Sequence, residues 1–129
     1  MGKKIFVIED DAFILATILA KLNLAGWSVG VENGLSPENK VLDNLRKFSP
    51  DFLILDLNLP QIDGLSVCRA MRAEEELMDT EVLVYTSAND QESRQSAERA
   101  GARHYYLKNE LNVNEFLARL FKIVENKYS

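Results

Sequence analysis

The sequence predicts an α/β fold: a single doubly wound, five-stranded parallel sheet with helices on both of its faces. Two observations lead to this prediction. Short apolar runs, typical of buried strands, alternate five times with longer segments whose apolar residues recur at helical spacing. Glycine, proline or small polar residues separate these segments, as expected where turns join strands to helices. The crossovers between parallel strands are expected to be right-handed.

The first strand, first helix and second strand open the chain. Residues 4–8 form a continuous apolar run and predict a buried strand. The helix that follows carries apolar residues at helical spacing, namely Phe13, Ile14, Leu15, Ile18, Leu19 and Leu22. Gly26 suits the left-handed position that ends such a helix. Residues 27–31 then predict a short second strand.

The middle of the chain repeats this pattern. Pro37 suits the first turn of a second helix, which Ser49 and Pro50 stop. Residues 52–56 predict the third strand, and a third helix follows Gly64. The inward-facing residues expected on that helix are Leu65, Cys68 and Met71.

The last two strands alternate with one weakly apolar and one strongly apolar helix. Residues 82–85 predict the fourth strand and residues 104–107 the fifth. Between them, residues 90–100 predict a polar helix, which buries little area and is therefore weakly anchored. Weakly anchored elements are those that move in switches, although a static surface helix is the alternative. The final helix has one apolar face, formed by Val113, Phe116, Leu117, Leu120, Phe121 and Val124.

Composition and charge exclude several classes of protein. The 129 residues fit one domain over residues 1–129, with an ordinary globular content of 47% hydrophobic residues. The single cysteine, Cys68, excludes a disulfide framework and a cysteine-based metal site. The sequence has no apolar stretch long enough for a signal peptide or a membrane span. We therefore expect a cytoplasmic protein. The net charge of −5 argues against direct nucleic-acid binding by this chain.

Polar side chains of complementary kinds follow four of the predicted strands. Glu9 and Asp10 follow the first strand, and Asp56 ends the third. If these strands are neighbours, the carboxylates converge, and two unit charges about 4 Å apart repel by roughly 4 kcal/mol at an effective dielectric near 20. Mg²⁺ is the usual remedy where all ligands are oxygens. Ser87 and Lys108 follow the fourth and fifth strands, and a hydroxyl and an ammonium can hold phosphoryl oxygens. Such a set describes phosphoryl transfer to a carboxylate.

Four motifs in order make the chain similar to a known family. They are residues 5–11, residues 55–60 with Asp63 and Gly64, residues 86–88, and residues 101–102 leading to Tyr105 and Lys108. Over about residues 3–124 the chain resembles the receiver domain of two-component response regulators. The resemblance implies a flavodoxin-like fold with strand order 2-1-3-4-5.

The resemblance also implies a role for each acidic position. Asp56 would accept the phosphoryl group and contribute to the metal site. Asp10 would bind Mg²⁺ directly, and Glu9 would help through water. The backbone carbonyl of Asn58 would be a further metal ligand.

Three further residues would handle the phosphoryl group and the signal. By the same resemblance, the Ser87 hydroxyl would bond a phosphoryl oxygen, and Ala88 would leave room for it. Lys108 would pair with the phosphoryl group as a point charge. Tyr105 matches the aromatic residue of the family's switch, which works together with Ser87, and a static surface aromatic is the alternative.

The chain departs from the commonest family pattern at three positions. Glu9 replaces an aspartate, Ser87 replaces a threonine, and Asn109 stands where a proline usually follows the lysine. A cis peptide before a residue other than proline costs about 3–4 kcal/mol. We therefore expect a trans Lys108–Asn109 bond and a rearranged loop that still lets Lys108 reach the site.

The function implied by the resemblance is a phosphorylation-controlled signalling switch, not a metabolic enzyme. A histidine kinase or histidine phosphotransferase would donate the phosphoryl group, and the domain would assist its own phosphorylation and dephosphorylation. The signal would leave through the fourth helix, fifth strand and fifth helix, towards a downstream protein, an output domain or a phosphorylation-dependent dimer. Both a complete single-domain regulator and the receiver of a longer protein fit this organisation.

Three other readings compete with this one. An aspartyl phosphohydrolase needs a second carboxylate two residues after the nucleophile, where this chain has Asn58. A flavodoxin-like cofactor binder needs a small polar phosphate loop, but residues 9–12 are mostly acidic. A degenerate receiver, which binds partners without being phosphorylated, is the nearest rival, although every active-site position is filled.

The single histidine, His104, is expected to be a packing or surface residue.

Overall fold

The computed structural model describes residues 3–128, and within this range five parallel strands form one sheet in the order β2-β1-β3-β4-β5. The strands are β1 (Lys4–Ile8), β2 (Ser28–Glu32), β3 (Phe52–Leu55), β4 (Glu81–Thr86) and β5 (His104–Leu107). The helices are α1 (Ala12–Leu24), α2 (Glu38–Phe48), α3 (Gly64–Arg72), α4 (Gln91–Arg99) and α5 (Val113–Tyr128). The predicted fold class and strand order are therefore confirmed.

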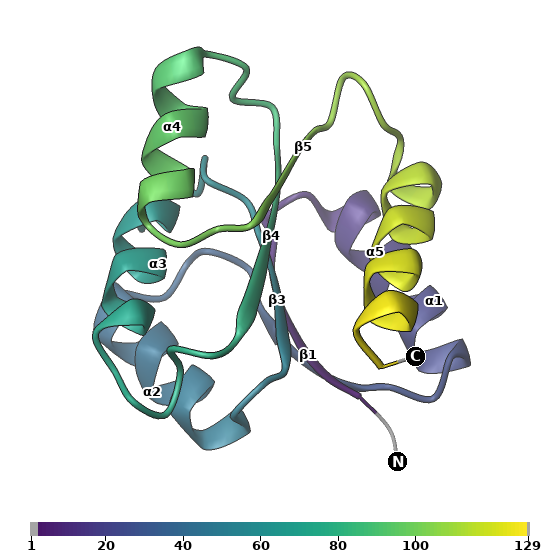
Figure 1. The fold of residues 1–129 in the computed structure, drawn as a ribbon, viewed down its shortest axis with the longest axis horizontal. Coiled ribbons are helices and arrows are strands. Elements are labelled where there is room, and N and C mark those ends of the chain that lie inside the picture. Colours follow the sequence, from purple (N-terminus) through teal and green to yellow (C-terminus); the bar gives the residue numbers. More distant parts are fainter. Residues whose placement is uncertain (1–2, 129) are drawn as a thin grey trace.

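Helices cover both faces of the sheet (Figure 1). Helices α2, α3 and α4 lie on one face, and α1 and α5 lie on the other. Successive strand residues point to opposite faces, so the sheet separates two apolar cores. The core under α2 and α3 takes Phe6, Ile8, Leu53, Leu55, Val82 and Val84 from the strands. The core under α1 and α5 takes Ile5, Val7, Phe52, Ile54, Leu83 and Tyr85.

Most predicted boundaries hold to within one or two residues. One difference is at β2, which was predicted to begin at Trp27 but begins at Ser28, and the half-buried Trp27 lies just before the strand. The Trp27 ring packs against Phe52 and Phe121, with centroids 6.1 Å and 5.8 Å apart. Gly26 has a φ of +81°, the left-handed conformation expected at the end of α1.

The register of the sheet brings the ends of β1 and β3 together. Ile8 pairs with Leu55, and the Asp56 N–H donates to the Ile8 carbonyl at 3.1 Å. Gly64 allows α3 to begin close to this point, because a Cβ there would lie 2.7 Å from the Asp56 carbonyl oxygen. The residues that follow β1 and β3 are thus held side by side at the carboxyl edge of the sheet, where ligands bind in open α/β folds.

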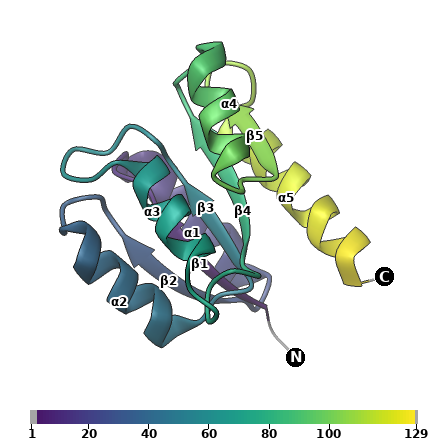
Figure 2. The ribbon, with the colours of Figure 1, turned by 60° about the vertical axis from the view of Figure 1, so that its left-hand side comes forward.

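Helix α4 is weakly anchored, as its sequence predicted. Of its residues, only Ala97 is buried. Figure 2 shows α4 and β5 together at one end of the sheet, with α5 beside them. Residues 3–128 contain no cis peptide bond, so the Lys108–Asn109 bond is trans, as predicted. No helix in the described range is long and apolar enough to cross a membrane.

Candidate functional site

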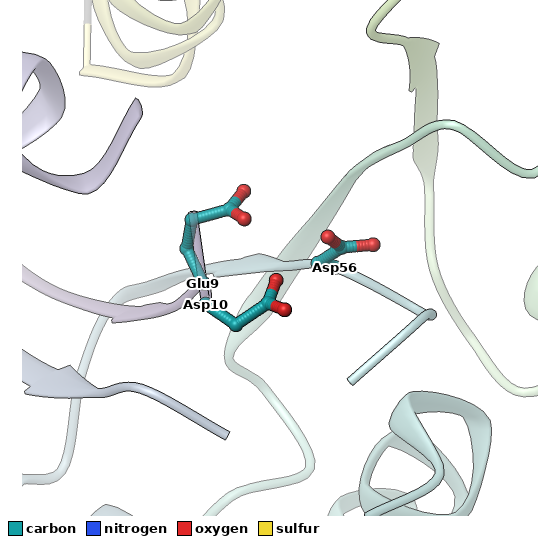
Figure 3. Close-up of side chains that lie close together, drawn as sticks. All are labelled: Glu9, Asp10 and Asp56. Carbon is teal, nitrogen blue, oxygen red and sulfur yellow. The ribbon is translucent and has the colours of Figure 1, made fainter. Parts of the chain in front are cut away.

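Three carboxylates from two neighbouring strand ends face a common space (Figure 3). Glu9 and Asp10 follow β1, and Asp56 follows β3. One carboxylate oxygen from each lies within 4.8 Å of the others. Glu9 and Asp56 are only 1% and 3% exposed, whereas Asp10 is open to solvent. The clustering predicted from the sequence is therefore present, and two of its three acids are removed from water.

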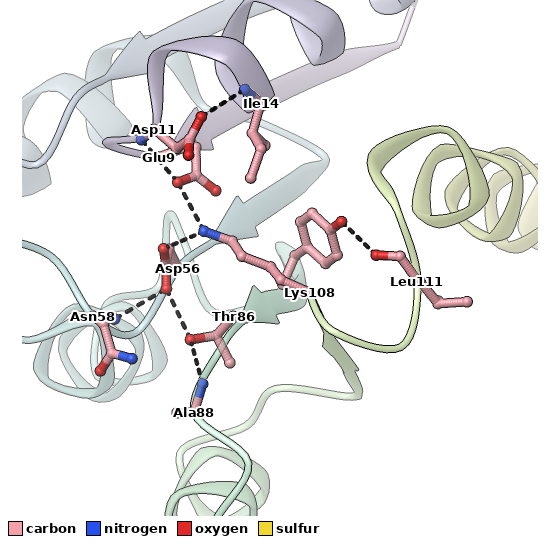
Figure 4. A network of polar contacts seen from close by, with 10 residues as sticks. Glu9, Asp11, Ile14, Asp56, Asn58, Thr86, Ala88, Lys108 and Leu111 are labelled. Atoms are coloured by element: carbon pink, nitrogen blue, oxygen red, sulfur yellow. Dashed lines mark hydrogen bonds and ion pairs between the residues drawn. The ribbon is translucent and has the colours of Figure 1, made fainter.

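The Lys108 ammonium lies between two of these acids (Figure 4). Its Nζ donates to Glu9 Oε2 at 3.0 Å and to Asp56 Oδ2 at 2.7 Å. Lys108 directly follows β5, and its backbone N–H donates to the Thr86 carbonyl at 2.9 Å. Burial alone would lower the pKa of Lys108, but its hydrogen bonds and proximity to Asp56 and Glu9 outweigh burial and raise that pKa. Lys108 therefore carries a full positive charge into the site.

Glu9 remains short of positive charge despite this contact. Burial raises the pKa of Glu9 to about 7, and the hydrogen bonds from the Asp11 N–H and from Lys108 only partly oppose that effect. Its second oxygen, Oε1, is buried and has no hydrogen-bond partner among the described residues. A buried carboxylate oxygen without a partner is a costly arrangement that a cation would relieve. The oxygen donors of Glu9, Asp10 and Asp56 are those that Mg²⁺ prefers.

Asp56 receives two further hydrogen bonds on its other oxygen. Its Oδ1 accepts from the Thr86 hydroxyl at 2.8 Å and from the Asn58 backbone N–H at 3.0 Å. Donors therefore reach both oxygens of the Asp56 carboxylate. Asn58 meets the site through its backbone, and its carbonyl as a metal ligand stays a prediction.

The hydroxyl next to Asp56 belongs to Thr86 and not to Ser87, which corrects the sequence-based assignment by one residue. Thr86 is the last residue of β4 and is fully buried. Ser87 lies beyond the strand, is exposed, and makes no side-chain hydrogen bond within the described residues. The strand is longer than predicted, which moves its end to Thr86. We therefore expect Thr86 to take the role that the resemblance gave to Ser87, in which case the chain has the threonine of the family pattern.

Tyr105 is turned towards the segment that follows Thr86. Its hydroxyl donates to the Ala88 carbonyl at 2.7 Å, and its half-buried ring packs against the core under α2 and α3. The Arg94 guanidinium lies over this ring, 5.3 Å from its centroid. Tyr105 thus connects α4 to the end of β4, as a switch residue would, but its movement stays a prediction.

His104 lies away from the acidic cluster. Its Nε2 is 2.7 Å from Glu81 Oε2, and Lys127 contacts the other Glu81 oxygen at 3.2 Å. Burial by itself would raise the pKa of Glu81, but these hydrogen bonds outweigh it and lower the pKa. His104 is therefore a half-buried pairing residue on β5, in line with the structural role expected for it.

Comparison with known proteins identifies a matching family and similar sequences. A family model for the response regulator receiver domain matches residues 5–121. The response regulator MprA of Mycobacterium bovis is 32% identical over 121 residues, which cover 93% of this chain and 50% of MprA. The chain thus spans about half the length of the curated relatives it matches.

Solved structures with the same fold include receiver domains. The BeF3-activated DrrB receiver domain is 28% identical, with a TM-score of 0.79 and coverage of 97% of this chain and 99% of that one. The receiver domain of the sensor histidine kinase PA1611 from Pseudomonas aeruginosa PAO1 is 24% identical, with a TM-score of 0.75. The alignment covers 95% of this chain and 97% of that domain, which is described with a magnesium ion coordinated in its active-site cleft.

The raised pKa of Glu9 predicts how stability depends on pH in EDTA. Between its ordinary value of 4.5 and about 7, the folded protein holds a proton that the unfolded chain releases. This stabilisation is complete below pH 4.5 and is lost as the pH rises through 7. Relative to Glu9→Gln, the wild type should lose on the order of 2 kcal/mol of unfolding free energy over this range, as measured by urea denaturation. Parallel curves of unfolding free energy against pH for the two proteins would contradict the raised pKa of Glu9.

Proposed function

The chain belongs to the response regulator receiver domain family, and we propose that Asp56 is the phosphoacceptor of a phosphorylation-controlled signalling switch. The observation that carries this proposal is the position of the Asp56 carboxylate. It is buried at the carboxyl edge of the sheet, with the Lys108 ammonium on one oxygen and the Thr86 hydroxyl on the other. Both donors lie close enough to Asp56 to turn towards the oxygens of a phosphoryl group attached to it.

The proposed reaction transfers the phosphoryl group from a phosphohistidine to Asp56. An Asp56 carboxylate oxygen attacks phosphorus, the P–N bond breaks, and the imidazole leaves and takes up a proton from solvent. Oδ2 of Asp56 accepts only the hydrogen bond from Lys108 and keeps a lone pair for the attack, whereas Thr86 and Asn58 occupy both lone pairs of Oδ1. The charge then spreads over the phosphoryl oxygens, to which Lys108 and Thr86 can redirect their hydrogen bonds. Positioning and charge stabilisation of this kind account for most catalysis of phosphoryl transfer.

The carboxylates of Glu9, Asp10 and Asp56 and the carbonyl of Asn58 would hold Mg²⁺. When bound, Mg²⁺ supplies positive charge against the phosphoryl oxygens. The buried, unpaired Oε1 of Glu9 and its raised pKa support a cation at this place. A glutamate reaches further from the backbone than an aspartate, which suits the supporting role proposed for Glu9.

The proposed donor is a histidine kinase or a histidine phosphotransferase, and the proposed output surface comprises α4, β5 and α5. The contact between Tyr105 and Ala88 joins this surface to Thr86, two residues earlier in the chain. Phosphorylation would draw the Thr86 hydroxyl from Asp56 towards a phosphoryl oxygen and shift the population of Tyr105 and α4 arrangements. The weak anchoring of α4 makes such a shift inexpensive.

The proposed target of this signal is a downstream protein, an attached output domain or a second copy of the chain. The relative RpaA of Synechocystis is described as a DNA-binding transcriptional regulator, and it is 30% identical over 118 residues that cover 47% of its length. With a net charge of −5, this chain is unsuited to bind nucleic acid itself. Any DNA binding would therefore belong to another domain. A cytoplasmic location suits a phosphohistidine donor.

The acceptor assignment predicts the outcome of phosphorylation by acetyl phosphate. With Mg²⁺ present, the wild type should gain one phosphoryl group, detected by intact mass spectrometry, and Asp56→Asn should gain none because an amide is not a nucleophile here. Asp63→Asn is the matched control, since Asp63 caps α3 in the same loop and asparagine caps equally well. Phosphorylation of Asp56→Asn at the wild-type level would exclude Asp56 as the acceptor.

The position of Thr86 predicts which hydroxyl matters for the reaction. Thr86→Val keeps the side-chain shape but removes a hydrogen bond to a charged group, worth roughly 1.5–3 kcal/mol. Phosphorylation by acetyl phosphate should slow by about 10- to 100-fold. Ser87→Ala, one residue away and exposed, should stay within about twofold of the wild type. Time courses of the phosphorylated fraction measure both, and a larger loss in Ser87→Ala would restore the assignment made from the sequence.

A further inference from the structure

A buried tyrosine from the middle of the sheet reaches the loop that carries Lys108. Tyr85 lies on β4 and is 1% exposed. Its hydroxyl donates to the Leu111 carbonyl at 2.7 Å, the bond drawn as the dashed line to Leu111 in Figure 4. Leu111 belongs to the loop between β5 and α5, residues 108–112, so this hydrogen bond ties the loop to the sheet.

The loop is compact and has few other attachments. The N–H groups of Glu110 and Leu111 both donate to the Leu107 carbonyl, at 3.1 Å and 3.0 Å. Asn112 exchanges hydrogen bonds with Glu115 at the start of α5. Among residues 3–128, the Tyr85 hydroxyl is the only side-chain donor from the sheet that bonds residues 109–112. The backbone N–H of Lys108 ties the first residue of the loop to Thr86 on β4, and Tyr85 supplies the side-chain bond that fixes the rest of the loop relative to that strand.

The same tyrosine also flanks the Lys108 side chain. Lys108 Nζ lies 5.9 Å from the centroid of the Tyr85 ring. The Tyr85 ring also contacts α5, because it stacks on Phe116 with ring centroids 4.2 Å apart and ring planes at 10° to each other. The ring is thus fixed between α5 and Lys108, and burial raises the pKa of Tyr85, which keeps the hydroxyl protonated as a donor.

We propose that Tyr85 is a positioning residue for Lys108. Tyr85 holds the loop of residues 108–112 so that the Lys108 ammonium meets Asp56. Tyr85 contacts neither Asp56 nor the phosphoryl group, and it acts through the lysine. The proposal rests on the function proposed for Asp56 and Lys108. It adds a restraint on the 2.7 Å contact between Lys108 and Asp56, beside the backbone hydrogen bond from Lys108 to Thr86. Misplacing a catalytic group by about 1 Å can cost up to 100-fold in rate.

The test removes only the hydroxyl. Tyr85→Phe keeps the stacking on Phe116 but cannot bond Leu111. Tyr106→Phe is the matched control, since Tyr106 also packs on Phe116, with centroids 5.8 Å apart. In acetyl phosphate and Mg²⁺, Tyr85→Phe should be phosphorylated about tenfold more slowly than the wild type, and Tyr106→Phe should be unchanged. A wild-type rate for Tyr85→Phe would overturn the proposal.

A second background separates positioning from a general structural effect. In Lys108→Gln the ammonium is absent, so adding Tyr85→Phe should change the residual rate by less than about twofold. The same tenfold loss in this background would show that Tyr85 does not act through Lys108, and would overturn the proposal.

A measurement without phosphorylation keeps this inference distinct from the function on which it rests. The Lys108 ammonium resonance in metal-free protein, observed by ¹⁵N NMR, should shift or broaden in Tyr85→Phe and stay unchanged in Tyr106→Phe. An unchanged resonance in Tyr85→Phe would overturn the positioning role. If the wild type were not phosphorylated at all, the proposed function would fail, while this resonance would still decide whether Tyr85 positions Lys108.

Discussion

The ammonium of Lys108 between Glu9 and Asp56 is the interaction on which the site depends. Lys108 is 99 positions from Glu9 and 52 positions from Asp56 in the chain. Two carboxylates about 4 Å apart would repel by roughly 4 kcal/mol at an effective dielectric near 20, and burial adds a desolvation cost to each. Three carboxylates gather here around one ammonium, and burial, with a smaller contribution from Asp56, raises the pKa of Glu9 to about 7. The site is therefore one cation short, which is the physical reason to expect Mg²⁺.

The fold supplies the geometry that this interaction needs. Parallel pairing of β1 with β3 places Glu9 and Asp56 at one edge, and β4 and β5 bring Thr86 and Lys108 to the same edge. The donors to Asp56 therefore come from different strands, and none depends on α4. In the proposed switch, this separation would let the Asp56 carboxylate stay fixed while the weakly anchored α4 and Tyr105 adjust to its phosphorylation.

The sequence predicted the fold and the acidic cluster well, because alternating apolar runs and helical stripes are strong local signals. Glu9 and Asp56 were found as the first polar residues after apolar strands. The same rule, applied to residues 82–85, selects Thr86, and choosing Ser87 instead misplaced the hydroxyl by one residue. The hydrogen bond from Tyr85 to Leu111 could not be predicted, because it joins residues that only the packed fold brings together. The start of β2 was misplaced because Trp27 is apolar for packing against Phe52 and not for strand pairing.

The most direct test of the central claim is the thermal stability of the protein as Mg²⁺ is added. A ligand that binds only the folded state stabilises it by about 2.7 kcal/mol at 100 times its dissociation constant, so the melting temperature of the wild type should rise steadily with Mg²⁺ concentration. Asp10→Asn should lose this rise. Asp11→Asn should keep it, because Asp11 caps α1 through Ile14 and asparagine preserves that cap. An equal rise in Asp10→Asn, or none in the wild type, would contradict a metal site built from these carboxylates.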